Sequence, residues 1–236
     1  TLLIFKFRSQ IEMVATKLKA KTLTMGYQKS ISVDWDQKSA IFKRLLDFDL
    51  NKINSIAGDK DKSELIKIRN MSHELVTGKG KPNNKKFLPQ GFEEQEAIDL
   101  NDKDFLTYVA YRYRYNTYPV TKTLSDYPPC VQIEPTSMCN FRCVMCYQID
   151  KSFSSKSQGH MGMMDLNMYK KAIDELEGNV QAITLASRGE PLMHPNIEEM
   201  ISYTGNKFLG FKLNTNASLL TEKRCHTLLQ SGLKTL

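Results

Sequence analysis

From Cys130 to the end of the chain, short apolar segments alternate with amphipathic helical segments, and this alternation constrains the fold more than any other feature. Strands are predicted at 130–135, 180–186 and 211–216, and the last four residues, LKTL, begin a fourth. Helices are predicted after these strands, at 164–178, 197–205 and 221–232, with Asp165 and Thr221 as N-caps of the first and the third. Strands that alternate with helices in this rhythm indicate βαβ units, and therefore an α/β fold with a parallel sheet.

Three segments with chemically active residues each follow one of the predicted strands. They are CNFRCVMC at 139–146, SRGEPLMHP at 187–195 and NTNAS at 214–218. In parallel α/β folds, ligands and catalytic groups gather in the loops that follow the carboxyl ends of the strands. We therefore expect the three segments to meet at one edge of the sheet.

The cysteine segment has the spacing C-x3-C-x2-C, formed by Cys139, Cys143 and Cys146. Thiolates bind zinc, copper(I) and iron–sulfur clusters. A structural zinc site needs four protein ligands, and an electron-transfer [4Fe–4S] cluster also uses four cysteines. Since Cys130 and Cys225 are single, the sequence offers three clustered thiolates. Three leave one coordination position open, as in a catalytic metal centre that binds a substrate or a cofactor.

With this spacing in the loop after the first strand, the chain resembles the radical S-adenosylmethionine (radical SAM) enzymes. The resemblance implies that Cys139, Cys143 and Cys146 hold a [4Fe–4S] cluster whose fourth iron binds S-adenosylmethionine. It implies reductive cleavage of that cofactor to a 5′-deoxyadenosyl radical, which abstracts hydrogen from a substrate. The implied fold is a partial (βα) TIM-like barrel, cut off here after about three βα units.

The other two segments support the same resemblance and add three cofactor-binding candidates, and Met145 of the cysteine segment is a fourth. Gly189 and Glu190 match the family's GGEP loop, although Arg188 stands where the motif's first glycine would be. Asn216 matches the TNG segment, with Ala217 in place of glycine. Met145 stands where the family has a bulky side chain beside the adenine. Thioether packing suits that role.

Each of these assignments has a plainer alternative. The three cysteines could form a structural zinc site with Cys130 or His160, in a non-enzymatic binding module, or belong to a ferredoxin-like electron carrier. Glu190 could be a surface acid and Asn216 a turn residue. Arg188 could pair with a carboxylate of the substrate or of the fold itself. The two other cysteines and two of the four histidines are interpreted as ordinary structural residues: Cys130, Cys225, His160 and His194.

The N-terminal region, which we assign to residues 1–125, reads as mostly helical, and the radical SAM core as residues 126–236. Helices are predicted at 39–58, 62–75 and 102–119, with a loop at 78–86. Pro119 should end the third helix. One face of that helix carries four tyrosines, which we expect to pack on a neighbouring domain: Tyr108, Tyr111, Tyr115 and Tyr118.

The composition is that of an ordinary globular protein, with 41% hydrophobic and 25% charged residues. A net charge of +7 is interpreted as a lysine-rich solvated surface in preference to nucleic-acid binding. No apolar run approaches the ~20 residues that span a bilayer. Clustered, reduced thiols indicate the cytosol.

The first residue is Thr1, and the last residues begin a strand. We therefore expect a fragment of a longer enzyme. The sequences of the motifs resemble those of the radical SAM branch that carries a cysteine-rich SPASM extension. The substrates of that branch are peptides, proteins, sugars or small metabolites. The resemblance also implies a one-electron reductant such as flavodoxin or ferredoxin.

Overall fold

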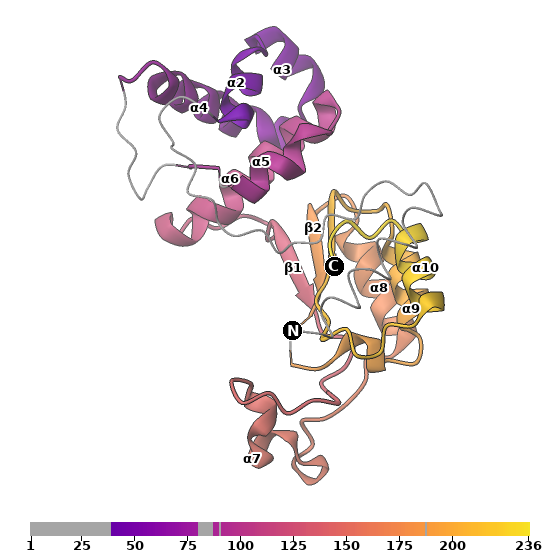
Figure 1. Ribbon diagram of the computed structural model, residues 1–236. Helices are drawn as coiled ribbons and strands as arrows, with labels where there is room; N and C mark the ends of the chain where they lie inside the picture. Colours follow the sequence, from indigo (N-terminus) through magenta and orange to yellow (C-terminus); the bar gives the residue numbers. More distant parts are fainter. Residues whose placement is uncertain (1–38, 80–86, 90, 187) are drawn as a thin grey trace. The chain divides into compact units, whose positions relative to one another are not determined.

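The computed structural model describes residues 39–79, 87–89, 91–186 and 188–236. The chain divides between Pro129 and Cys130 into two compact units, each with its own core. Residues 80–86 of the predicted loop lie outside the described residues. The first unit is helical (Figure 1), and its helices are α2 (Ala40–Leu46), α3 (Leu50–Ile56), α4 (Asp59–Val76), α5 (Gly91–Ile98) and α6 (Asp102–Thr121).

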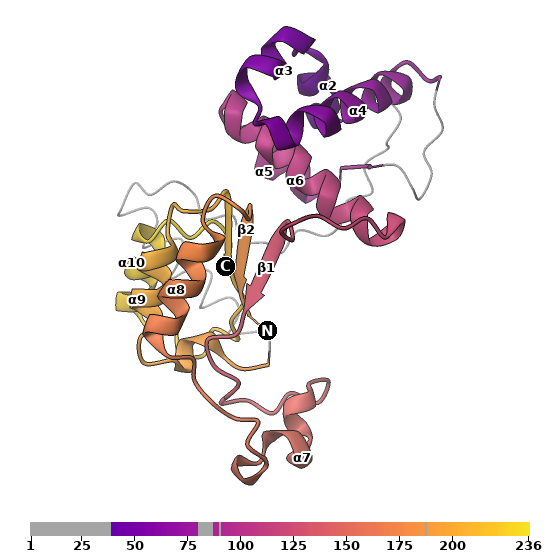
Figure 2. The same cartoon turned by 180° about the vertical axis from the view of Figure 1, so that it is seen from behind.

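The second unit is a small parallel sheet with helices packed on it. Its strands are β1 (Cys130–Ile133), β2 (Ala182–Leu185) and β3 (Gly210–Leu213), in the order β1-β2-β3. Helices α8 (Leu166–Leu176), α9 (Ile197–Thr204) and α10 (Glu222–Gln230) lie on one side of this sheet in both views (Figures 1 and 2). The short elements are η1 (Tyr147–Ile149), α7 (Lys151–Ser154), η2 (Lys156–Gln158) and η3 (Pro191–Met193).

This arrangement confirms the predicted α/β class and the three βα units. The predicted fourth strand is present as a single parallel bridge between Lys212 and Thr235. Two helix starts are capped as the sequence suggests, because Asp165 accepts from the backbone N–H groups of Asn167 and Met168, and Thr221 accepts from that of Arg224.

The core of the sheet unit forms because each strand turns apolar side chains toward the helices. Ile183 on β2 and Leu213 on β3 are fully buried, and they belong to one cluster with Tyr169 and Ile173 of α8 and Ile201 of α9. Burial of apolar surface on this scale is the main favourable contribution to folding of such a unit.

The strand register sets where the following loops begin. Ile133 pairs with Leu185, and Leu185 pairs with Leu213, so the three strands end at the same level. The loops after β1, β2 and β3 therefore leave the sheet side by side, as the sequence predicted. Everything described below as the candidate site lies at this edge.

The single helix predicted at 39–58 is wrong, because two helices occupy this range. Asp49 interrupts the helix, because its carboxylate accepts from the backbone N–H of Lys52 at 2.6 Å and so caps the start of α3. A capping carboxylate competes with a continuous helix at that position. Gly58, predicted as a helix end, stands at the N-cap of α4.

Helix α6 also differs from the prediction at its end and along its tyrosine face. It continues past Pro119 to Thr121, and Lys122, with φ of 55°, ends it. The hydroxyl of Tyr108 donates to Glu96 of α5 at 2.6 Å, and that of Tyr118 donates to Glu64 of α4. These two tyrosines thus pack within their own unit.

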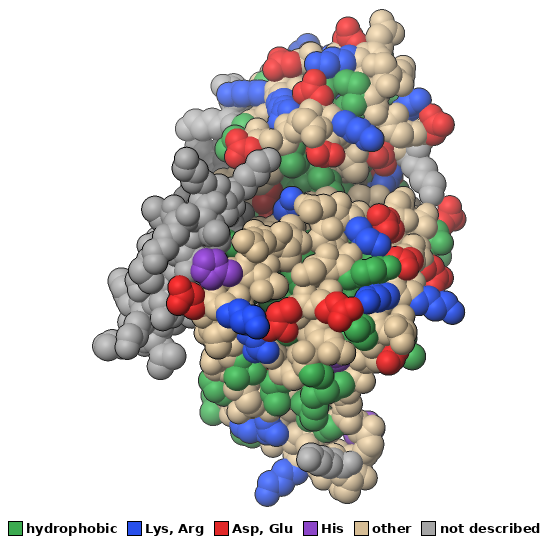
Figure 3. All heavy atoms as spheres, turned by 90° about the vertical axis from the view of Figure 1, so that its right-hand side faces the viewer, with side chains coloured by type: hydrophobic (Ala, Val, Ile, Leu, Met, Phe, Trp, Pro, Cys, Tyr) green, Lys and Arg blue, Asp and Glu red, His purple; other side chains and the backbone are tan. Residues whose placement is uncertain are grey.

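Charged side chains on the helical side of the sheet unit are largely paired. Lys170 contacts Glu199 at 2.6 Å, and Arg224 contacts Glu198 at 2.6 Å. Figure 3 shows basic and acidic side chains interspersed over the face that it presents. Among the described residues, none of the helices is both long and apolar enough to cross a bilayer.

Tyr169 provides a test of this core. Its ring is fully buried, its hydroxyl is 2.5 Å from Thr204 Oγ1, and burial raises the pKa of the phenol to about 12. We expect Tyr169→Phe to lower the free energy of unfolding by about 1 kcal/mol, because one buried hydrogen bond is lost while Thr204 still donates to Met200 O.

The measurement is urea unfolding followed by circular dichroism. Tyr203→Phe is the matched control, since the Tyr203 hydroxyl contacts Asp174 near the surface. Equal effects of the two substitutions would contradict the assignment of Tyr169 to the core.

Candidate functional site

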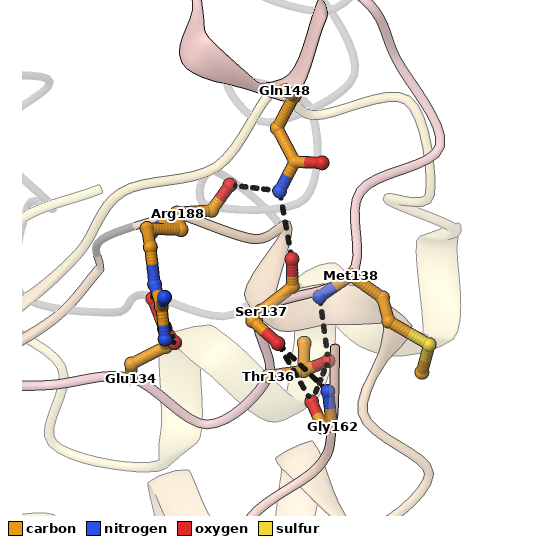
Figure 4. Close-up of polar contacts among 7 residues, drawn as sticks. All are labelled: Glu134, Thr136, Ser137, Met138, Gln148, Gly162 and Arg188. Atoms are coloured by element: carbon orange, nitrogen blue, oxygen red, sulfur yellow. Dashed lines mark hydrogen bonds and ion pairs between the residues drawn. The ribbon is translucent and has the colours of Figure 1, made fainter. Parts of the chain in front are cut away.

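The loop that carries the three cysteines is closed at its base by a clasp between Thr136, Ser137 and Gly162. Ser137 N donates to Gly162 O at 3.0 Å, and Gly162 N donates to Ser137 Oγ at 2.7 Å. Thr136 Oγ1 also donates to Gly162 O at 3.0 Å (Figure 4). Because the clasp fixes both ends, residues 138–161 leave the edge of the sheet and return to it as one loop.

Within this loop, the chain turns tightly between the second and third cysteines. Cys146 N donates to Cys143 O at 2.9 Å, as the C-x2-C spacing allows. Cys139 Sγ accepts from the backbone N–H of Phe141 at 3.4 Å and from Asn216 Nδ2 at 3.8 Å. These contacts tie the sulfur of the first cysteine to its own loop and to the loop after β3.

The loop after β2 packs directly against the start of the cysteine loop. Glu190 N donates to Met138 O at 2.8 Å. At Gly189 there is no room for a side chain, since a Cβ there would lie 2.0 Å from Thr136 O and 2.6 Å from Met138 O. The residue after Arg188 is therefore required to be glycine by this close backbone approach.

The Glu190 side chain joins the loop after β2 to the loop after β3. It is 2% exposed, so it is not the surface acid that was the alternative interpretation. Its carboxylate accepts from Leu192 N at 3.0 Å, from Thr215 Oγ1 at 2.6 Å and from Asn216 N at 2.6 Å. A buried carboxylate is tolerated only with such donors, so these groups are held in place together.

Asn216 connects the loop after β3 to the cysteine loop. Its Nδ2 donates to Asn140 Oδ1 at 2.9 Å, while Ser218 N donates to its Oδ1 at 2.9 Å. The latter bond is an Asx turn, so the turn role and the contact with the cysteine loop coexist. Ala217, which replaces the motif's glycine, has φ of 65°, in the left-handed region that favours glycine.

Arg188 is held by a carboxylate of the fold, which answers the question that its sequence left open. Its Nη2 is 2.6 Å from Glu134 Oε1, its Nε is 2.9 Å from Oε2, and its backbone N–H donates to Oε2 at 2.8 Å (Figure 4). The hydrogen bonds that the guanidinium donates to Glu134 raise its pKa. The guanidinium also lies 5.0 Å from the centre of the Phe153 ring.

Gln148 is a further buried polar residue that the sequence did not reveal. Its Nε2 donates to Ser137 O and to Arg188 O, both at 2.7 Å (Figure 4). Its Oε1 is buried and has no hydrogen-bond partner among the described residues. Leaving a buried acceptor without a donor costs about 1–3 kcal/mol. Neither spacing nor composition marks this glutamine, because its partners are distant in sequence.

The structure brings some of the predicted residues together and leaves others apart. Cys139, Gly189, Glu190 and Asn216 are linked by the contacts above. Met145 is 87% exposed and Cys143 is also exposed, on the outer part of the cysteine loop. No three His, Cys, Asp or Glu side chains in the described part of the chain gather around a single metal ion. A cluster of four irons binds each thiolate at a different iron, so it does not require such convergence.

Contacts within the fold surround the four other residues that the sequence analysis considered: Cys130, Cys225, His160 and His194. Cys225 is buried in α10, where burial raises the pKa of its thiol, and Cys130 is half-buried at the start of β1. His194 is buried, accepts from Asn196 N at 3.1 Å through Nδ1, and lies 2.9 Å from Met164 O through Nε2. The His160 ring is exposed and stacks on Phe153.

These features define an α/β protein with a cysteine-rich loop at the carboxyl edge of its parallel sheet. Residues 133–236 match the model of the radical SAM superfamily. Through these residues the chain is similar to the radical SAM superfamily, whose members are enzymes that use an iron–sulfur cluster and S-adenosylmethionine.

Curated relatives resemble the same part of the chain. A tungsten-containing aldehyde ferredoxin oxidoreductase cofactor-modifying protein of Pyrococcus furiosus is 29% identical over 102 residues, which are 42% of this chain and 27% of that protein. The mycofactocin maturase MftC of Mycobacterium tuberculosis is 31% identical over 96 residues, 41% of this chain and 23% of that protein. The matched part thus spans about a quarter of these relatives' length.

One solved structure is also similar in part. It is BtrN in complex with AdoMet and 2-DOIA, with 25% identity, a TM-score of 0.39, and coverage of 47% of this chain and 44% of BtrN. A TM-score this low supports no argument, so the similarity to the radical SAM superfamily rests on the sequence match.

The residues at this edge fit an iron–sulfur cluster with a bound cofactor. The donor set consists of soft thiolates, and Cys139 Sγ already accepts two N–H groups, as cluster-binding sulfurs do. The backbone of Gly189 and the orphaned Gln148 Oε1 lie beside the start of the cysteine loop.

The packing at Gly189 yields one prediction. We expect Gly189→Ala to lower the free energy of unfolding by about 1–3 kcal/mol, because the new methyl group collides with backbone atoms that cannot yield as a side chain would. Gly162→Ala is the matched control, since a Cβ there meets nothing within 4 Å. Denaturant unfolding measures both, and equal stability of the two variants would refute the close approach.

Ala217 yields a second prediction. Replacing it with glycine removes the cost of a left-handed conformation, about 1 kcal/mol, and adds some entropy to the unfolded chain. We expect Ala217→Gly to be neutral or to stabilise by up to about 1 kcal/mol, whereas glycine at exposed helical positions such as Lys171 should destabilise. A clear loss of stability in Ala217→Gly would show that its φ is not positive.

Proposed function

We propose that the chain is part of a radical SAM enzyme in which Cys139, Cys143 and Cys146 hold a [4Fe–4S] cluster. The observation that carries the proposal is a C-x3-C-x2-C loop at the carboxyl end of β1, within residues that match the radical SAM superfamily. When bound, the reduced cluster supplies one-electron cleavage of S-adenosylmethionine to a 5′-deoxyadenosyl radical, which abstracts hydrogen from a substrate.

The chain's own residues hold the site in shape. Gly189 and Glu190 present backbone groups beside the cysteine loop, and we propose that they contact the methionine part of S-adenosylmethionine. We propose Asn216 as a polar contact near the cofactor, because its Nδ2 already reaches Cys139 Sγ and Asn140. Met145, exposed on the loop, is proposed to cover the adenine.

The wider context is proposed on the same basis. We propose two parts for the chain, a helical N-terminal region at 1–125 and the radical SAM core at 126–236. A cytoplasmic location suits reduced thiols, and flavodoxin or ferredoxin is the proposed reductant. The full-length enzyme is proposed to carry a SPASM extension and to act on a peptide, protein, sugar or small metabolite.

The test is anaerobic reconstitution of the chain with iron and sulfide, followed by measurement of 5′-deoxyadenosine after reduction in the presence of S-adenosylmethionine. We expect Cys139→Ser, Cys143→Ser and Cys146→Ser each to reduce its formation to the level of the sample without protein, because each thiolate holds a different iron. Cys130→Ser is the matched control and should keep the activity of the wild type.

Other outcomes separate the alternatives. Retained cleavage in any one of the three loop variants would count against the proposal. A colourless protein with one bound zinc would support the non-enzymatic binding module. A cluster whose spectrum does not change on addition of S-adenosylmethionine would support an electron carrier.

A further inference from the structure

Gln148 lies two residues beyond the last of the three cysteines, yet its side chain turns back into the base of the site. It is 1% exposed, and both hydrogens of its amide nitrogen are used, on Ser137 O and Arg188 O at 2.7 Å each. Since Nε2 faces two carbonyl oxygens, the orientation of the carboxamide is determined by its partners.

The two carbonyl groups belong to different loops. Ser137 precedes Cys139 by two residues and forms part of the clasp, whereas Arg188 directly precedes Gly189. One side chain thus joins the cysteine loop to the loop after β2. The Glu190 N–Met138 O hydrogen bond joins the same two loops independently. Loss of the Gln148 hydrogen bonds should therefore loosen the spacing of the two loops, while the Glu190 N–Met138 O hydrogen bond keeps them attached.

The carboxamide oxygen of Gln148 points away from both of these contacts (Figure 4). It is buried, and no residue in the part of the chain that the structure describes donates a hydrogen bond to it. A buried acceptor without a donor is stabilised strongly when a ligand supplies an N–H or O–H group.

We propose that Gln148 is a positioning residue that sets the spacing between the cysteine loop and the loop after β2, and that its Oε1 accepts a hydrogen bond from the bound cofactor. The inference rests on the proposed function. The cluster is held by the cysteine loop alone, whereas S-adenosylmethionine would contact both loops. A change at Gln148 should therefore affect cofactor binding and spare cluster assembly.

The test compares Gln148→Leu with the wild type and with Gln158→Leu. Leucine has a similar size and makes no hydrogen bonds, and Gln158 is an exposed glutamine of the same segment. Three quantities are measured on the reconstituted full chain: iron per protein, the midpoint of thermal unfolding, and the dissociation constant for S-adenosylmethionine from the change in the reduced cluster's electron paramagnetic resonance spectrum.

In Gln148→Leu we expect iron content close to that of the wild type and a slightly lower midpoint, because Ser137 O and Arg188 O lose a donor. The dissociation constant should rise about tenfold, equivalent to about 1.4 kcal/mol. The KM for S-adenosylmethionine should rise by a similar factor, with kcat for 5′-deoxyadenosine formation within about twofold, because binding is lost and not chemistry. Gln158→Leu should match the wild type in all of these.

Other results would overturn the inference. An unchanged dissociation constant would exclude the role, and a parallel loss of iron, thermal midpoint and cofactor binding would reduce Gln148 to a structural residue. If Gln148→Leu does not fold, Gln148→Glu replaces it. Glutamate keeps the length of the side chain and an acceptor oxygen, but it loses both N–H donors. Unchanged binding of S-adenosylmethionine by Gln148→Glu would refute the positioning role. A wild type that assembles no cluster or binds no S-adenosylmethionine refutes the proposed function itself.

Discussion

The carboxylate of Glu190 is buried at the edge of the sheet among donors from two loops, and the geometry of the site depends on it. Leu192 N lies in its own loop, while Thr215 and Asn216 belong to the loop after β3. The cost of burying a carboxylate is offset only while all these donors stay in place. Because Glu190 N also donates to Met138 O, the cysteine loop is fixed to the same point. One residue therefore sets the relative positions of all three loops.

Sequence patterns predicted the parts of the structure that depend on local or periodic features. The strand–helix alternation and the caps at Asp165 and Thr221 are local, and the meeting of three loops at one edge follows from parallel topology. The inward turn of Glu190 and the bridging by Gln148 were not predicted, because each depends on partners that are distant along the chain. The split at Asp49 was missed for another reason: apolar spacing continued through a residue whose side chain prefers to cap.

The two departures from the expected motif have different physical consequences. Arg188 replaces a glycine, and its side chain extends out to Glu134 and Phe153, which hold the guanidinium. Ala217 replaces a glycine where φ is positive, and its methyl group adds strain to the turn. Identity with a motif thus matters at a position only where the backbone conformation or the space requires it.

The clasp between Thr136, Ser137 and Gly162 separates the cysteine loop from the rest of the sheet unit. The hydrogen bonds of the clasp join Thr136, Ser137 and Gly162, and none of them uses a thiol. The contacts of the sheet core likewise involve none of the three loop cysteines. A chemical change confined to these thiols would therefore act first on the chain between the two ends of the clasp, and the contacts that hold the sheet together would stay in place.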